Sequence, residues 1–221
     1  MGTVALIVDD CGYDLPLAKE LIGMDAALTL SILPMAPYAK QTALAATGDG
    51  KEVMLHMPME PIERKDPNMP PCEVVFGASE KEVVSALTEA LKTVPGLSGV
   101  NNHEGSKACT DERAMRAVMK ELKRLGLYFI DSKTTPDSVA YSVAKEVGVK
   151  SASRDVFLDN DDDVEAIKTE MKRLVSLSAR LNGPVIGICH LRKKTVRALK
   201  EAIPEATSHG NKFVFASQVV K

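Results

Sequence analysis

Short apolar runs alternate with amphipathic segments along the whole chain, and this alternation constrains the fold more than any other feature. The apolar runs predict buried strands near residues 4–8, 27–33, 52–55, 97–100, 127–130, 150–153, 184–188 and 212–215. Helical segments, with apolar residues three or four positions apart, lie between most of them. A repeated strand–helix unit of this kind predicts parallel strands joined by helical crossovers.

We expect a single α/β domain over residues 1–221, folded as a distorted β/α barrel. Seven or eight mostly parallel strands would form the sheet, with the helices outside. An open doubly wound sheet is the alternative for the same alternation. The stretch at residues 60–77 contains four prolines, Pro61, Pro67, Pro70 and Pro71. We interpret it as a loop over one face and not as a domain linker, because the strand–helix pattern resumes after it.

Charge and hydropathy exclude two classes of partner. The formal net charge is −2, so there is no electrostatic reason to expect binding to nucleic acid or to an anionic membrane surface. No apolar run approaches the roughly 18 residues that a membrane span requires. Aromatic residues make up only 4% of the chain and Trp is absent, which argues against an extended aromatic surface for stacking sugar rings.

The four cysteines, Cys11, Cys72, Cys109 and Cys189, include no C-x-x-C pair. This spacing does not support a structural zinc site or a thioredoxin-like motif. A domain of this size needs no disulfide scaffold, so we expect apolar fillers or isolated thiols. One pairing among Cys11, Cys109 and Cys189 stays open, because these three lie near the polar clusters described next.

Residues 4–12 join a buried strand to two adjacent acids, Asp9 and Asp10. Successive side chains of a strand point to opposite faces, so both acids can serve one site only if the strand ends there. Gly12 supports such an ending, because glycine permits a sharp exit. The alternative is that the two acids cap the helix expected at residues 15–24.

Polar residues follow most of the other expected strands. They are His56, the group Asn101, Asn102 and His103, then Asp131, the pair Arg154 and Asp155, and finally His190. Because parallel strands end on one face of a barrel, we expect these side chains to meet on the face that carries the active site in barrel enzymes. The fourth histidine, His209, stands beside Gly210 in an expected turn and should be solvated.

One carboxylate with two histidines is a usual ligand set for a catalytic zinc or a similar divalent ion. Such an ion activates water, and a second carboxylate nearby can accept the proton of that water. Asp9 and Asp10 offer both acids in one place. The alternative for each histidine is a hydrogen-bonded pocket residue without a metal.

Six segments of the chain resemble the motifs of the divergent polysaccharide deacetylases, relatives of the metal-dependent chitin and peptidoglycan deacetylases. They are IVDDCGY at 7–13, LHMPMEP at 55–61, GVNNHEGS at 99–106, FIDSKTT at 129–135, RDVFLD at 154–159 and GICH at 187–190. They occur in the expected order and span nearly the whole chain. Each motif alone is weak, but the set is specific.

The resemblance implies a distorted β/α barrel that removes N-acetyl groups from an amino-sugar polysaccharide or a cell-wall glycan. In the better-known relatives the first Asp of the pair is the base and the second binds the metal, which assigns these roles to Asp9 and Asp10. The relatives' late histidine acts as the acid, which His190 matches. This chain lacks their H-x-x-x-H segment, so His56 and His103 would reach the metal from different strands.

The resemblance also implies a divalent metal, with zinc the expected ion, and a carbohydrate substrate. We expect Asn101, Asn102, Ser106, Asp131, Arg154 and Asp155 to contact the substrate or to support the residues around the metal. The first strand begins almost at Met1, which fits a chain trimmed to its folded domain. We therefore expect the native protein to be exported or periplasmic, with its signal segment missing from this sequence. The alternative function is a non-catalytic envelope protein that keeps the fold to bind glycan or a partner protein.

Overall fold

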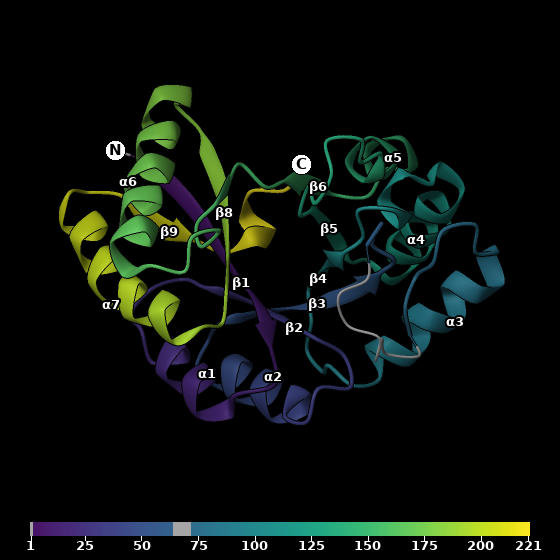
Figure 1. Cartoon of the computed structure of the whole chain (residues 1–221), viewed down its shortest axis with the longest axis horizontal. Coiled ribbons are helices and arrows are strands. Elements are labelled where there is room, and N and C mark those ends of the chain that lie inside the picture. Colours follow the sequence, from purple (N-terminus) through teal and green to yellow (C-terminus); the bar gives the residue numbers. More distant parts are fainter. Residues whose placement is uncertain (1, 64–71) are drawn as a thin grey trace.

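The computed structural model describes residues 2–63 and 72–221 of the protein. Its strands form one sheet that curls into a half-barrel, with the helices outside (Figure 1). The order is β6-β5-β4-β3-β2-β1-β8-β7, and β9 also pairs with β1. Paired strands run parallel throughout. The distorted β/α barrel is confirmed, and the open doubly wound sheet is wrong.

The strands are β1 (Thr3–Cys11), β2 (Thr29–Ile32), β3 (Glu52–Met59), β4 (Gly99–Glu104), β5 (Tyr128–Asp131), β6 (Ser151–Ser153), β7 (Val156–Phe157), β8 (Pro184–His190) and β9 (Lys212–Val214). The α-helices are α1 (Leu15–Ile22), α2 (Ala39–Gly48), α3 (Glu80–Leu91), α4 (Glu112–Leu125), α5 (Ala140–Val147), α6 (Val164–Leu181) and α7 (Lys193–Ser208). The described residues also form the short 3₁₀ helices η1 (Ala108–Thr110) and η2 (Ala216–Gln218). Within the described residues no helix has the length and apolarity that crossing a membrane requires.

β1 is the central strand of the sheet. β8 pairs along one edge of β1, while the other edge is shared by β9 near the start of the strand and by β2 near its end. Alternate residues of β1 enter two different apolar cores. Leu6 and Val8 pack between the sheet and the helices, whereas Ala5 and Ile7 fill the inside of the barrel. Burial on both faces explains the uninterrupted apolar run.

β3 and β4 extend beyond their apolar runs into polar sequence. The two strands pair as far as Met59 and Glu104, with His56 opposite Asn101 and Pro58 opposite His103. The expected ends at residues 55 and 100 are therefore wrong. Pairing between the backbones of β3 and β4 keeps both strands extended beyond the end of their apolar runs. As a result these polar side chains lie within the sheet, near its carboxyl end.

The barrel has a narrow seam between its terminal strands, β6 and β7. Arg154 N donates to Asp131 O on one side of the seam at 3.0 Å, and Asp155 N donates to Ile186 O on the other at 2.9 Å. Two consecutive residues therefore join the two edges of the sheet. β7 escaped sequence analysis because two residues are too few for a recognisable pattern.

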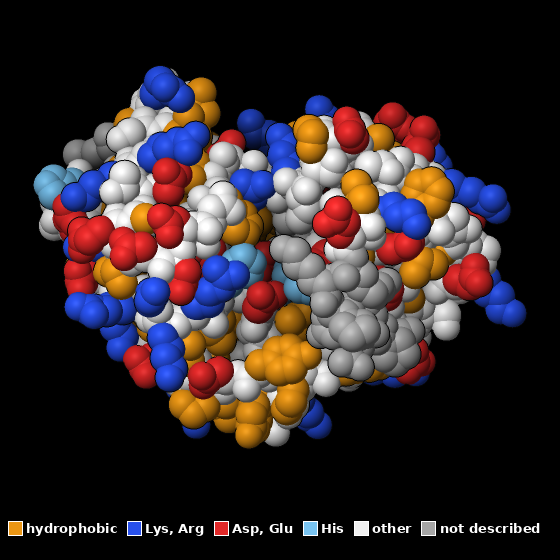
Figure 2. All heavy atoms as spheres, viewed as in Figure 1, with side chains coloured by type: hydrophobic (Ala, Val, Ile, Leu, Met, Phe, Trp, Pro, Cys, Tyr) orange, Lys and Arg blue, Asp and Glu red, His pale blue; other side chains and the backbone are white. Residues whose placement is uncertain are grey.

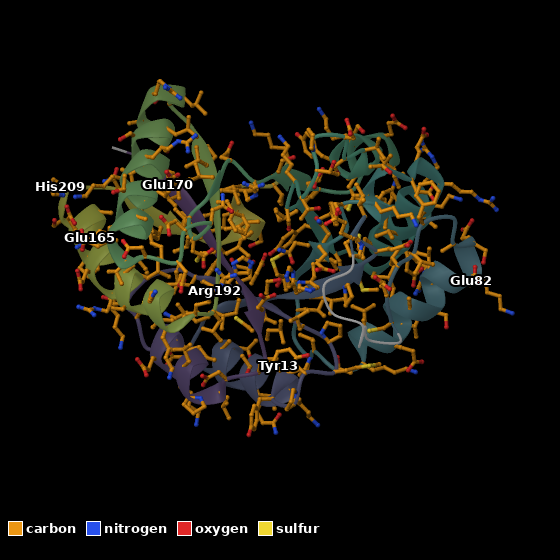
Figure 3. All side chains as sticks on the ribbon, in the orientation of Figure 1. Tyr13, Glu82, Glu165, Glu170, Arg192 and His209 are labelled. Carbon is orange, nitrogen blue, oxygen red and sulfur yellow. The ribbon has the colours of Figure 1, made fainter. Side chains whose placement is uncertain are left out.

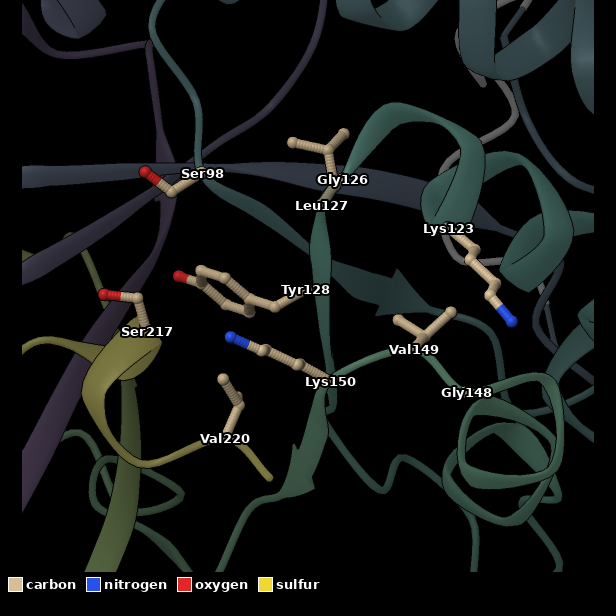
Figure 4. A pocket seen from close by; sticks show the side chains of 10 residues that line it. All are labelled: Ser98, Lys123, Gly126, Leu127, Tyr128, Gly148, Val149, Lys150, Ser217 and Val220. Carbon is tan, nitrogen blue, oxygen red and sulfur yellow. The ribbon is translucent and has the colours of Figure 1, made fainter.

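The amino end of the barrel is closed by its own side chains. The Tyr128 hydroxyl donates to Glu52 Oε1 at 2.9 Å, and Thr29 Oγ1 donates to the same oxygen at 2.9 Å. A cavity of about 350 Å³ lies beside Tyr128 (Figure 4), with Ser98 and Lys150 in its lining. Each of these two residues precedes a strand, so this cavity lies at the end opposite to the predicted polar clusters.

Side chains cap the first turns of α3 and α4. Ser79 and Glu82 form a capping box at the start of α3. Asp111 caps α4 by accepting from two backbone N–H groups. Thr110, just before it, donates its hydroxyl to Lys107 O at 2.8 Å. A carboxylate is the stronger partner for the unpaired amides of a first turn.

The four cysteines are buried and unpaired, which confirms the expectation of isolated thiols. The pairing left open among Cys11, Cys109 and Cys189 is wrong. Their sulfur atoms have separate partners: Val8 O for Cys11, Met59 Sδ for Cys109 and Ile7 O for Cys189.

Candidate metal centre

Asp9 and Asp10 reach one site because β1 bulges, and not because it ends. The strand continues to Cys11, and its register with β2 shifts between Val8 and Cys11. Asp10 has φ 57°, a left-handed conformation that Asp tolerates better than most residues. A bulge re-aims side chains in this way. Both carboxylates consequently approach His56 Nε2, Asp9 Oδ2 at 3.7 Å and Asp10 Oδ1 at 3.4 Å.

Asp10, His56 and His103 form a compact triangle of potential ligands. His103 Nδ1 lies 3.1 Å from His56 Nε2 and 3.3 Å from Asp10 Oδ1. Asp10 Oδ1 is buried and has no hydrogen-bond partner, although both imidazole nitrogens are near it. Ligand atoms bound tetrahedrally to one zinc ion lie about 3.3 Å apart. The separations and the unpaired oxygen therefore fit a divalent ion held by these three side chains.

Asn101 orients His56 for this task. The Asn101 amide nitrogen donates to Asp9 Oδ1 at 2.8 Å, so its oxygen faces His56 Nδ1, also at 2.8 Å. The reversed amide would turn its oxygen toward the Asp9 carboxylate. His56 Nδ1 therefore carries the proton, and Nε2 presents its lone pair to the triangle. Metal-binding histidines are commonly fixed through the second ring nitrogen in this way.

The electrostatics of the site favour a positive charge. Burial alone would lower the pKa of His56, but the carboxylates of Asp9 and Asp10 outweigh it and raise the pKa above its ordinary value. Burial alone would raise the pKa of Asp10, yet the imidazoles of His103 and His56 lower it below its ordinary value. A field that stabilises imidazolium beside ionised carboxylate also stabilises a divalent cation.

Asp9 has different surroundings from Asp10, although the two are neighbours. Its side chain is buried, and burial raises the pKa of Asp9 despite the opposing effects of His56 and the hydrogen bond from Asn101. A carboxylate with a raised pKa next to a metal site suits a base that takes a proton from water.

His190 faces the site from β8 and is held by Asp159. Its Nδ1 lies 3.0 Å from Asp159 Oδ1, and its Nε2 lies 3.9 Å from Asp10 Oδ2. Asp159 is fully buried and also accepts from Thr195 Oγ1 at 2.8 Å. Burial alone would raise the pKa of Asp159, but its hydrogen bonds, those from His190 foremost, lower it. The ionised Asp159 thus keeps Nδ1–H as donor and turns Nε2 toward the site.

Three of the other predicted site residues hold the loops around the site. Asn102 points to the opposite face of β4 from Asn101, and its amide oxygen accepts from Ser132 N at 2.9 Å. Ser106 Oγ accepts from Ile62 N at 2.9 Å. Asp131 accepts from Lys133 N and from Ser138 Oγ, both at 2.8 Å.

Arg154 and Asp155 lie at the seam of the barrel. The Arg154 guanidinium donates to Ser132 O at 2.7 Å and covers the Phe157 ring at 4.9 Å from its centroid. That ring makes an edge contact with the His190 imidazole. The side chain of Asp155 is directed elsewhere, because Asp155 Oδ2 accepts from Ile186 N at 2.8 Å, four residues before His190 along β8. Of the pair, only Arg154 is linked to the site.

Two residues of the site were missed by sequence analysis, Ser31 and Asp159. Ser31 Oγ donates to the Asn101 amide oxygen at 2.6 Å from within an apolar strand, where a single serine gives no signal. Asp159 follows the short apolar run at residues 156–158, just as Asp9 and Asp10 follow the apolar run at residues 4–8. An acid after every apolar run, however short, is the signal that could have found it.

The site opens on the face shown in Figure 2. Histidine and acidic side chains gather there at a hollow near the middle of the surface, and Arg192, labelled in Figure 3, lies next to it. Arg192 Nη1 donates to Asp159 O at 3.2 Å. His103 and Asp10 remain partly accessible, with side-chain exposures of 28% and 34%. A substrate can therefore reach the triangle of ligands from solvent.

The carboxyl ends of the strands thus bring together a candidate metal centre, a buried carboxylate and an anchored histidine. The chain belongs to the divergent polysaccharide deacetylase family, whose sequence profile matches residues 6–220. It is 34% identical over 202 residues to the uncharacterized protein YibQ of Escherichia coli K12, covering 91% of this chain and 62% of that protein. The chain thus spans less than two thirds of the length of that relative.

Solved structures share the fold. An uncharacterized protein from Agrobacterium tumefaciens superimposes with a TM-score of 0.93 at 23% identity, over 99% of this chain and 89% of that one. The catalytic domain of a peptidoglycan N-acetylglucosamine deacetylase from Eubacterium rectale gives a TM-score of 0.61 at 13% identity, over 97% and 88%. These similarities show that the chain shares its fold with the deacetylase domain.

Proposed function

We propose that this protein is a metal-dependent hydrolase that removes N-acetyl groups from an amino-sugar polysaccharide or cell-wall glycan. The observation that carries the proposal is the triangle of Asp10 Oδ1, His56 Nε2 and His103 Nδ1, all within 3.4 Å of one another. Family membership and the deacetylase fold support the choice of reaction. Such a substrate would place the native protein outside the cytoplasm.

Asp10, His56 and His103 would hold the ion, and zinc suits this set of one oxygen and two nitrogen ligands. A divalent ion at this position supplies Lewis acidity, which polarises a carbonyl oxygen and makes water a better nucleophile.

Asp9 and His190 would move the protons of the reaction. Asp9 accepts a proton as water attacks the acetyl carbon, and Asn101 holds the carboxylate in place at 2.8 Å. His190, carrying protons on both ring nitrogens and held by Asp159 through Nδ1–H, donates the Nε2 proton to the amide nitrogen as the C–N bond breaks. The products are acetate and a free amino sugar. The two groups lie opposite each other on paired strands, since Asp9 is in register with His190.

The test is acetate release from oligomers of N-acetylglucosamine, measured with purified protein, after treatment with a chelator, and after zinc, manganese or nickel is restored. We expect release that the chelator abolishes and one of the metals restores. Activity that survives complete metal removal would contradict the proposal.

The alternative is a non-catalytic protein that binds glycan with the same fold. The chain lacks the H-x-x-x-H segment of the better-known relatives, and His56 and His103 come from different strands. This departure from the relatives' pattern is compatible with a protein that binds glycan without cleaving it. Stoichiometric metal and glycan binding without acetate release, across several acetylated oligosaccharides, would favour this alternative.

A further inference from the structure

Exposed large apolar side chains gather at the end of the barrel that carries the metal centre. Tyr13, Met35 and Tyr38 follow β1 and β2, and Ile62, Val75 and Phe76 lie in the connection after β3. Figure 2 shows a group of apolar side chains directly below the histidines, where Figure 3 labels Tyr13. Clustered exposed apolar surface marks a binding site more often than chance scatter does.

Tyr13 is the most exposed aromatic side chain of the described residues, at 61%. It is presented by Gly12, which has φ +117° and lies so close to Ala36 that an added Cβ would stand 2.8 Å from the Ala36 side chain. Tyr38 N donates to Gly12 O at 2.9 Å, which brings the two tyrosine-bearing loops together. Tyr38 is itself 42% exposed.

Tyr13 stands close to the reacting centre in the chain. Only Cys11 and Gly12 separate it from Asp10, so the Cα atoms of Tyr13 and Asp10 are at most about 10–11 Å apart. A polymeric substrate with one acetyl group at the metal centre must extend its neighbouring units over the surrounding surface. Tyr13 lies within reach of such a unit.

We propose that Tyr13, with Tyr38 beside it, forms the platform for a sugar ring next to the acetylated one. The C–H bonds on one face of a pyranose carry partial positive charge and pack on the negative face of an aromatic ring, and the phenol can hydrogen-bond a hydroxyl group. This inference rests on the proposed function, because it takes a glycan as the substrate. It adds that Tyr13 and Tyr38, which lie outside the catalytic group, give the protein a preference for oligomers over single sugars.

The experiment measures affinity by calorimetry for two probes, N-acetylglucosamine and its tetramer. All proteins carry Asp9→Asn, so that the probes are not consumed. Tyr13→Ala should weaken binding of the tetramer about three- to tenfold, the worth of one aromatic face, and leave the monomer unchanged. Tyr13→Phe keeps the face and should stay within about twofold of the parent. Leu181→Ala is the matched control, because Leu181 is 58% exposed at the far end of α6 and should change neither affinity.

Each contrary result has its own meaning. Equal tetramer affinity in the parent and in Tyr13→Ala would overturn the platform while leaving the proposed function intact. No binding of either sugar by the parent would contradict the proposed function and the platform with it. Binding to phosphatidylcholine vesicles that depends on Tyr13, without sugar binding, would overturn the choice of a sugar as occupant.

Discussion

Asp9 and Asp10 illustrate how adjacent identical residues acquire different chemistry. Asp10 stands in a left-handed conformation with one buried oxygen that no hydrogen bond satisfies. Asp9 is more deeply buried and bonded to Asn101, and burial raises its pKa whereas that of Asp10 is lowered. The first arrangement suits a metal ligand, and the second suits a base.

This difference predicts opposite outcomes for two conservative variants. Asp10→Asn should lose the metal, because the ion needs the anionic oxygen. Asp9→Asn should keep the metal and lose turnover by about 10²–10⁴-fold, because an amide cannot accept the proton. Metal content and acetate release measured on both variants decide the matter. Undiminished activity in Asp9→Asn would mean that Asp9 only supports the following turn.

Asn101 holds both His56 and Asp9, and its replacement tests whether metal binding depends on the orientation of His56. Asn101→Ala removes the acceptor of His56 Nδ1–H, so the ring loses its fixed orientation and metal affinity should fall about 10–100-fold. Competition with a coloured chelator measures this affinity. Ser31→Ala is the control, since it removes one donor to Asn101 but leaves the bond to His56. An equal loss in both variants would point to general disruption of the barrel.

Residue patterns predicted much of the candidate site. Histidines and acids after apolar runs were expected to meet, and the structure brings Asp9, Asp10, His56, His103 and His190 together. Ser31 was missed, because a single serine within an apolar strand has no periodic signature, and only its proximity to Asn101 reveals its role. Asp159 was missed because the apolar run before it is only three residues long.

At the scale of elements, the bulge in β1 is the feature that no sequence pattern indicated. Alternation along a strand excludes two neighbouring acids from one site unless the strand ends, and Gly12 made an ending plausible. Instead, the register shift between Val8 and Cys11 directs both acids to one site while the strand continues to Cys11. Bulges depend on how two strands pair, which a single segment does not encode.

Gly99 at the start of β4 shows how tightly the elements pack. A Cβ at this position would lie 2.4 Å from the Tyr128 ring, on the paired strand β5. Gly99→Ala should destabilise the protein by about 1–3 kcal/mol through overpacking. Gly48→Ala, at the end of α2 with nothing within 4 Å, should be neutral or stabilise by up to about 1 kcal/mol. Urea unfolding measures both, and equal stabilities would contradict this description of the sheet.

For the whole molecule, the parallel pairing of the strands brings the residues of the candidate site together. Every strand of the sheet runs the same way, so the side chains at strand ends share one rim although they are far apart in the chain. Strand–helix alternation was sufficient to predict this arrangement. The narrow seam at Arg154 and Asp155 was not predictable, because it depends on hydrogen bonds from two consecutive residues to opposite edges.

The positions of the exposed aromatic residues were also not predictable from composition. A low aromatic content argued against a surface for sugar rings, yet composition does not say where the few aromatic side chains lie. Tyr13 and Tyr38 are both exposed beside the candidate site.

The acid stability of the molecule should depend on Asp159. Its pKa is lower in the folded protein than its ordinary value, because hydrogen bonds outweigh burial. The ionised carboxylate therefore contributes stability that is complete above the ordinary pKa of about 3.9 and is lost as the pH falls through the folded value. Asp159→Asn should cost about 1–3 kcal/mol at neutral pH. The difference from the parent should shrink in acid, as urea unfolding from neutral pH down to acid would show; a constant difference would contradict the role of its charge.

The metal site is tested most directly by the metal content of the parent protein and of His103→Ala, measured by elemental analysis after equilibration with zinc. We expect one ion per chain in the parent and none in the variant, with unchanged circular dichroism showing that the variant stays folded. A folded His103→Ala protein that keeps one ion per chain would contradict the site formed by Asp10, His56 and His103.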